Sequence, residues 1–226
     1  MKKGLTGAQL KWIAMITMFI DHIGAVIVQG LAFNMGDDSL ITPLYWSLRL
    51  IGRLSFPIYA FLLVEGFKHT SNVKKYGFNL LLFALISEIP FDLATSNFII
   101  NPSYQNIFFT LFLGLVLMSL AKDKPRWLSI IIFGIGALIN EYLLLADYGA
   151  YGIILIAGIY LLRNYKVTQN IFIFSIGFIQ MVQGFSVIFI NAYNGKRGKQ
   201  NKYFFYLFYP IHLLILYFIV KTFIPM

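Results

Sequence analysis

Residues 12–31 read WIAMITMFIDHIGAVIVQGL, and this stretch decides how the chain folds. It is long and apolar enough for a helix that crosses a bilayer, which needs about 20 such residues. Asp21 and His22 stand side by side in its middle. An Asp at bilayer depth costs on the order of 3 kcal/mol, so such groups are kept where they face a protein interior or a wet cavity. The stretch therefore predicts a membrane helix that carries a functional pair.

The rest of the chain extends this pattern. Hydrophobic residues make up 59% of the 226 residues, charged residues 12%, and the mean hydropathy is +0.75. This composition predicts an all-α fold: a polytopic transmembrane helical bundle, about eight helices (roughly 7–9), in one integral membrane domain over 1–226. The apolar segments are 10–31, 44–66, 76–95, 106–121, 127–145, 149–163, 170–190 and 203–224. Because 106–121 and 149–163 are short, one of them is a candidate for a broken or re-entrant segment.

Composition also limits the chemistry. The absence of cysteine excludes disulfides and thiolate nucleophiles, and three separated histidines argue against a metal site. The net charge of +9 lies mostly in short loops, as the positive-inside rule produces. No basic folded domain is present to bind nucleic acid.

Loop charges predict the orientation. Lys2, Lys3 and the loops at 68–75 and 122–126 are basic, whereas the loops between them lack Lys and Arg, and Asp37 and Asp38 are acidic. This alternation predicts a multi-pass protein of the inner (cytoplasmic) membrane with a cytoplasmic N-terminus. The basic loop 194–202 lies outside if there are eight crossings and inside if 149–163 is re-entrant. The charge pattern does not decide between the two.

The ionisable residues inside the helices are expected to meet at one depth. At a rise of about 1.5 Å per residue, they fall in the outer half of the bundle, with His212 near its midplane. The set comprises Asp21, His22, Arg49, Arg53, Glu88, Asp92, Glu141 and Asp147. This convergence predicts a polar cavity reached from the outer side. Structural pairing is the competing interpretation, with Asp21 and Arg53 as a pair at matching depth.

The spacing of these residues constrains their roles. Adjacent helix residues point about 100° apart, so Asp21 does not readily orient His22 within one helix. We expect Asp21 to pair with an arginine and His22 to be the reactive base, with His212 as its rival. A histidine pKa near 6.5 suits either residue to act at neutral pH.

Several blocks of sequence together resemble the TraX family. They are IDHIG (20–24), RLIGRLSFPIYAF (49–61), EGF (65–67), LISEIPFD (85–92), ADYG (146–149), YNGKRG (193–198) and FYPIH (208–212). The blocks extend over nearly the whole chain. The resemblance implies a membrane acetyltransferase, because the family's best-known member N-acetylates the amino terminus of conjugative pilin subunits. The family also resembles larger transmembrane acyltransferases fed by cytosolic acetyl-CoA, in which a histidine near the first helices is the usual candidate catalyst, and this favours His22.

The resemblance and the residues together suggest a set of roles. Acetyl-CoA is the expected co-substrate, without a metal, and the partners are membrane lipids and an extracytoplasmic protein, glycan or lipid acceptor. His22 either deprotonates the acceptor amine or hydroxyl or takes the acetyl group transiently. The remaining assignments are oxyanion stabilisation by Arg49 or Arg53, acceptor binding by Glu88, Asp92 and Asp147, and CoA phosphate binding by Asn194, Lys196 and Arg197.

Two other functions fit parts of the sequence. Buried ionisable residues also mark transport paths, so a small transporter or flippase is the main alternative. The chain lacks the paired interrupted helices expected of inverted repeats, which argues against it. A non-enzymatic assembly factor is the third candidate, in which neither His22 nor His212 would be needed.

Overall fold

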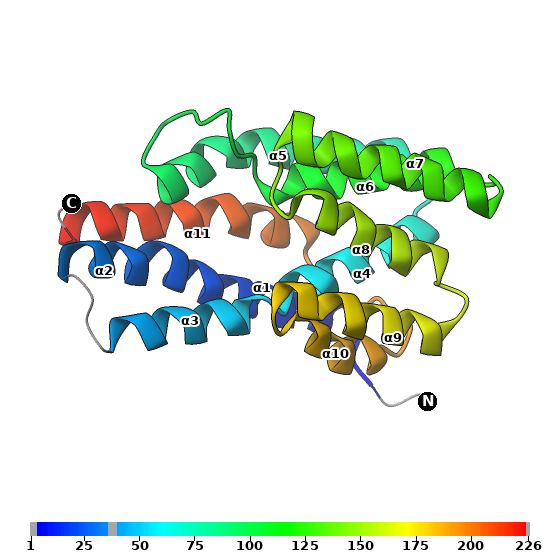
Figure 1. Ribbon diagram of the computed structural model, residues 1–226, viewed down its shortest axis with the longest axis horizontal. Helices are drawn as coiled ribbons and strands as arrows, with labels where there is room; N and C mark the ends of the chain where they lie inside the picture. The colour runs from blue at the N-terminus through cyan, green and yellow to red at the C-terminus, as the bar shows by residue number, and fades with distance from the viewer. Residues whose placement is uncertain (1–3, 36–39, 225–226) are drawn as a thin grey trace.

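A computed structural model describes residues 4–35 and 40–224, and Figure 1 shows an all-helical molecule. Lys2, Lys3, Asp37 and Asp38, used above for orientation, lie outside the described residues. The elements in chain order are α1 (Gly7–His22), the π-helix η1 (Ile23–Val28), α2 (Gln29–Met35), α3 (Ile41–Gly52), α4 (Ser55–His69), α5 (Val73–Ser96), α6 (Ile107–Ala121), α7 (Arg126–Ile139), the π-helix η2 (Asn140–Leu144), α8 (Gly149–Leu161), α9 (Lys166–Gly177), the 3₁₀ helices η3 (Phe178–Gln180) and η4 (Gln183–Ser186), α10 (Val187–Asn191) and α11 (Lys202–Phe223). The expected all-α membrane bundle is confirmed.

Several of these helices are long enough to cross a membrane. Within the described residues, five stretches qualify by length and composition: Gly7–Ala32, Ile41–His69, Val73–Ser96, Arg126–Leu144 and Tyr203–Phe223. Two shorter apolar helices, α6 and α8, lie among them. The chain is therefore a multi-pass membrane protein.

The break in the helical pattern is not where the sequence placed it. Both short segments, 106–121 and 149–163, form unbroken helices, so the expectation of a broken segment there is wrong, and re-entry of either stays a prediction. Instead, the apolar segment 170–190 is broken. Lys166 Nζ donates to the Asn191 carbonyl at 3.2 Å, so α9 begins at the same end of the bundle at which α10 ends. The segment is thus a hairpin and not a single crossing.

Two glycines explain the hairpin. A Cβ added at Gly177 would overlap the backbone of Gly184, and one at Gly184 would overlap the Phe174 carbonyl. The two arms therefore approach to backbone contact, which only residues without side chains permit. Hydropathy does not detect this turn because the flanking residues remain apolar.

The basic loop lies at the end of the bundle where α1 begins, which we call the N-terminal end. The amides of Gly7 and Ala8 donate to the carbonyls of Lys196 and Arg197, each at 2.8 Å. These carbonyls satisfy two of the amides that every helix leaves unpaired in its first turn. The loop and the start of α1 therefore lie at the same end of the bundle, and the side of the membrane that this end faces stays a prediction.

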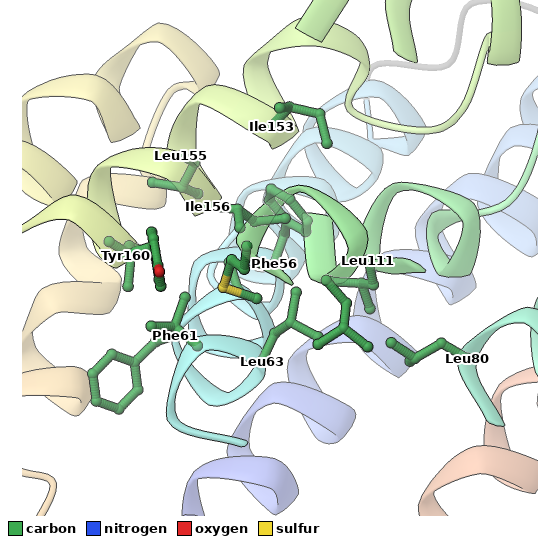
Figure 2. Close-up of a cluster of buried hydrophobic side chains, with 14 of the residues drawn as sticks. Phe56, Phe61, Leu63, Leu80, Leu111, Ile153, Leu155, Ile156 and Tyr160 are labelled. Carbon is green, nitrogen blue, oxygen red and sulfur yellow. The ribbon is translucent and has the colours of Figure 1, made fainter. Parts of the chain in front are cut away.

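The apolar core holds the site-bearing helices in place. Figure 2 shows Phe56 and Leu63 of α4, Leu111 of α6 and Ile156 of α8 converging in one buried cluster. Phe56 and Ile156 are no more than 2% exposed. The cluster fixes the start of α4 and the start of α8, which flank the polar site.

The arrangement of the hairpin can be tested by cysteine labelling, because the natural chain has no cysteine. Lys124, Lys199 and Lys221 are all exposed. We expect a membrane-impermeant maleimide to label Lys124→Cys and Lys199→Cys from one side of the membrane and Lys221→Cys from the other. Eight straight crossings would put Lys124→Cys and Lys199→Cys on opposite sides, which would contradict the hairpin.

A second test concerns the contact between α1 and α3. A Cβ at Gly52 would overlap the Asp21 side chain. We expect Gly52→Ala to lower the free energy of unfolding by about 1–3 kcal/mol, because a well-packed interface does not absorb the extra methyl group. Denaturant unfolding in detergent measures the change. Gly134→Ala is the matched control, since nothing lies within 4 Å of its added Cβ, and it should be neutral or stabilising. Equal stability of the two variants would show that the helices do not meet at Gly52.

Candidate functional site

The site begins at the end of α1. Asp21 and His22 occupy its last turn, and the chain then continues as the π-helix η1. A π-helical turn inside a longer helix is rare and is frequent at functional sites. Gly24, in that turn, lies close to α3, where an added Cβ would be 3.0 Å from Leu48 Cβ.

A histidine pair lies at the centre of the site. His22 Nδ1 and His212 Nε2 are 2.6 Å apart, and His212 Nδ1 lies 2.7 Å from the Phe208 carbonyl oxygen. His212 is 3% exposed and His22 is half-buried. The sequence left the two histidines as rivals, whereas the fold joins them directly.

The hydrogen bonds of the pair assign its protons. A carbonyl oxygen only accepts, so His212 Nδ1 must donate to Phe208. Neutral His212 then accepts at Nε2, and His22 must donate from Nδ1. His22 Nε2 is consequently left with a free lone pair. His22 is the available base, and His212 fixes its tautomer and orientation.

Aromatic rings enclose the histidine pair. The ring of Tyr209 packs edge-on against both imidazoles, with centroids 5.9 Å from His22 and 5.7 Å from His212. Phe208 stacks on His212 at 4.7 Å. The pair is therefore held in a largely apolar environment, in which hydrogen bonds are stronger than in water.

An ion pair lies next to the histidines. Asp21 Oδ2 accepts a hydrogen bond from Arg49, with side chains 14% and 20% exposed. The expected pairing of Asp21 with an arginine is confirmed. Its partner is Arg49 and not Arg53, because α3 ends at Gly52 and Arg53 lies in the turn before α4.

Arg53 belongs to a second group of polar side chains, around the start of α8. It hydrogen-bonds the Tyr148 phenol, whose ring stacks on Phe56 with centroids 4.0 Å apart. Asp147 accepts from the Tyr104 hydroxyl at 2.6 Å and from the Tyr148 amide at 2.9 Å. Burial raises the pKa of Asp147, and the hydrogen bond from Tyr104 partly opposes this effect.

The two acids of α5 hold the loop 97–106. Glu88 accepts hydrogen bonds from the side chain and backbone of Asn106, and Asp92 accepts from the Asn101 amide at 2.7 Å. Each acid keeps a second oxygen, Glu88 Oε1 and Asp92 Oδ1, without a partner among residues 4–35 and 40–224. The predicted roles of Glu88, Asp92 and Asp147 in acceptor binding stay predictions.

The loop residues proposed for CoA binding serve the fold as well. Asn194 donates from Nδ2 to the Gly4 carbonyl at 2.9 Å and accepts from the Lys196 amide, also at 2.9 Å. The loop is thereby ordered, while Lys196 and Arg197 are exposed. Phosphate binding by these side chains stays a prediction.

Sequence reasoning missed three contributors: Phe208, Tyr104 and Tyr148. Phe208 acts through its backbone carbonyl, which no sequence pattern marks. Tyr148 had a local signal, because it stands between Asp147 and Gly149 in a turn, and its φ of 66° is unusual for a residue other than glycine. In the part of the chain that the structure describes, no group of three or more His, Asp or Glu side chains could hold a metal ion.

These features define a multi-pass helical membrane protein with a histidine pair and an arginine–aspartate pair in its interior. The chain belongs to the TraX family: the family model described as TraX protein matches residues 6–220. It is also 32% identical over 126 residues to the probable fimbrial assembly protein FimC, serogroup H1, of Dichelobacter nodosus. The match covers 51% of this chain and 46% of that protein, so the chain matches less than half of the relative's length. No solved structure matches the chain.

The Asp21–Arg49 pair generates a prediction. We expect Asp21→Leu and Arg49→Leu each to lower the free energy of unfolding by about 2–3 kcal/mol, because each leaves a mostly buried charge unpaired. The double variant should recover most of this loss, since no charge then remains. Denaturant unfolding of the wild type, the two single variants and the double variant in detergent gives the coupling free energy between Asp21 and Arg49. Additive losses would show that the two residues act independently.

Proposed function

We propose that this protein is a membrane-embedded acetyltransferase that moves an acetyl group from acetyl-CoA to an amine or hydroxyl of an extracytoplasmic acceptor. The observation that carries the proposal is the hydrogen-bonded pair of His22 and His212, which leaves Nε2 of the half-buried His22 as an oriented base. General bases of this kind contribute typically about 10²–10⁴-fold to a rate. The family membership supports the same chemistry.

The acetyl-transfer step needs only one base. His22 Nε2 takes the proton of the acceptor N–H or O–H while that atom attacks the thioester carbonyl carbon. The C–S bond then breaks, the acetyl group stays on the acceptor, and the CoA sulfur leaves as a thiolate. The proton on His22 returns to the sulfur, which regenerates neutral His22. No metal or further cofactor is required.

Arg49 and Arg53 supply the positive charge for the transition state. An oxyanion forms on the thioester oxygen, and a preorganised donor near it is worth about 10²–10³-fold in rate. Arg49 forms a salt bridge with Asp21, whereas Arg53 hydrogen-bonds the uncharged Tyr148 phenol. Asp21 and Asp147 act on Arg53 only at longer range, and it forms no salt bridge among the described residues, so we assign the oxyanion to it.

The two substrates reach the site from opposite ends. Lys196 and Arg197 are exposed at the N-terminal end, where they can bind the CoA phosphates together with Asn194. In this proposal that end faces the cytoplasm of a bacterial cell and the protein lies in the inner membrane. The unpaired oxygens of Glu88 and Asp92 attract the cationic amine of the acceptor, and one of these carboxylates takes its extra proton so that the neutral amine attacks.

The relative in Dichelobacter nodosus is named as a fimbrial assembly protein. We therefore propose a surface-structure subunit such as a pilin N-terminus, including those used in conjugation, as the first acceptor class to test. A non-enzymatic role in assembly would use the same partner without acetyl transfer. A transporter or flippase would move the acceptor and leave acetyl-CoA unconsumed.

The central prediction concerns the histidines. We expect His22→Ala to reduce acetyl transfer at least 100-fold, because the base is lost. His212→Ala should lose less activity than His22→Ala. His212→Gln should lose even less, because a Gln amide oxygen can accept the hydrogen bond from His22 Nδ1 in place of His212 Nε2. Mass spectrometry of the acceptor after incubation with isotopically labelled acetyl-CoA measures the transfer.

A binding control accompanies this assay. All three variants should remain stabilised against heat by acetyl-CoA, because none of them removes a donor-binding group. Full activity of His22→Ala would refute the assigned base. A wild-type protein that neither binds nor consumes acetyl-CoA would favour transport or assembly.

A further inference from the structure

The tip of the α9–α10 hairpin is an irregular segment within an apolar stretch. The chain leaves the helical path between η3 and η4, where Met181 has a φ of 64°. Non-helical backbone at membrane depth is tolerated where it is buried in protein or lines a cavity. Membrane transporters use such broken helices to bind polar ligands. The role of this tip is not explained by the histidine chemistry.

Two polar side chains are fully buried at the tip. Gln183 and Ser186 both have 0% exposure. The Tyr151 hydroxyl donates to Gln183 Oε1 at 2.8 Å, whereas Gln183 Nε2 and Ser186 Oγ have no partner within the described residues. Whichever way the amide is turned, one of its ends stays unpaired. Buried polar groups without partners are rare and call for a ligand.

The tip lies beside the proposed catalytic site. The Tyr151 ring is 6.3 Å from that of Tyr148, which hydrogen-bonds Arg53. Tyr151 therefore connects Gln183 to the arginine that we place at the oxyanion.

The hairpin also connects this site to the N-terminal end. Its base is fixed there by the contact between Lys166 and Asn191. The rises of η4 and α10 place Gln183 roughly 15 Å deeper than Asn191. Gln183 and Ser186 thus lie between the exposed basic loop and the polar centre.

We propose that Gln183 and Ser186 bind the amide groups of the pantetheine arm of acetyl-CoA. This inference rests on the proposed function, and it specifies how the donor is held. The arm joins the CoA phosphates to the thioester, and each of its secondary amides offers both a carbonyl acceptor and an N–H donor. Gln183 Nε2 donates to one carbonyl, and Ser186 Oγ pairs with the same or the neighbouring amide. The phosphates then lie at the N-terminal end and the thioester reaches His22.

The test compares CoA with adenosine 3′,5′-bisphosphate, which lacks the pantetheine arm. Their dissociation constants are measured by calorimetry on the purified protein in detergent. We expect Gln183→Leu to raise the Kd of CoA about five- to tenfold, as the loss of one or two neutral hydrogen bonds implies, and to leave the Kd of the bisphosphate unchanged. Ser186→Ala, a smaller change, should act in the same direction and covers the case in which Gln183→Leu does not fold.

Gln180→Leu is the matched control, since Gln180 lies in the same irregular segment and is half-buried. It should leave both constants unchanged. Unchanged CoA binding in both tip variants, or an equal loss for CoA and the bisphosphate, would overturn the pantetheine site while leaving acetyl transfer by the wild type intact. A wild-type protein that transfers no acetyl group would instead refute the proposed function.

Discussion

The ion pair between Asp21 and Arg49 is the contact on which the rest of the polar interior depends. An Asp within an apolar helix is tolerated only when it has a partner, and Arg49 supplies one from α3. Gly52 allows α3 to approach closely enough, because its missing side chain leaves room for Asp21. Once Asp21 faces α3, the next residue must face about 100° away. That direction brings His22 to α11, where it meets His212.

This geometry explains how much the sequence could predict. The apolar segments and the pairing of Asp21 with an arginine follow from hydropathy and helix rise, whereas the common depth of the buried charges stays a prediction. The choice of Arg49 over Arg53 does not follow from them, because it depends on α3 ending at Gly52. The bond between His22 and His212 joins residues 190 positions apart, and only the packing of α11 against α1 determines it. The hairpin at 170–190 was missed because its turn holds glycines and uncharged polar residues, and the stretch has no charged residue to mark a break.

The two ends of the bundle use their polar groups differently. At the N-terminal end, backbone carbonyls of the basic loop cap α1, which leaves the charged side chains of Lys196 and Arg197 exposed. Near the C-terminal end of α5, the acidic side chains themselves stabilise the fold, because Glu88 and Asp92 accept hydrogen bonds from the loop 97–106. Replacing these acids would therefore disturb the loop as well as any acceptor. Substitutions in the basic loop are therefore better suited to separate effects on donor binding from effects on stability.

The distribution of unpaired atoms argues that the interior is built for ligands. A chain selected only for stability would satisfy its buried polar groups, since each unsatisfied group costs about 1–3 kcal/mol. Here Asp21 leaves one carboxylate oxygen unpaired beside Arg49 and His22, and Glu88 leaves one unpaired beside the loop 97–106. At the hairpin tip, the Gln183 amide nitrogen and the Ser186 hydroxyl have no partner among the described residues. The first set presents acceptors, which suit a cationic amine, and the second presents an amide and a hydroxyl, which suit a neutral amide. The two sets therefore differ in chemistry, as would the two substrates of the acetyl transfer to an amine that we propose.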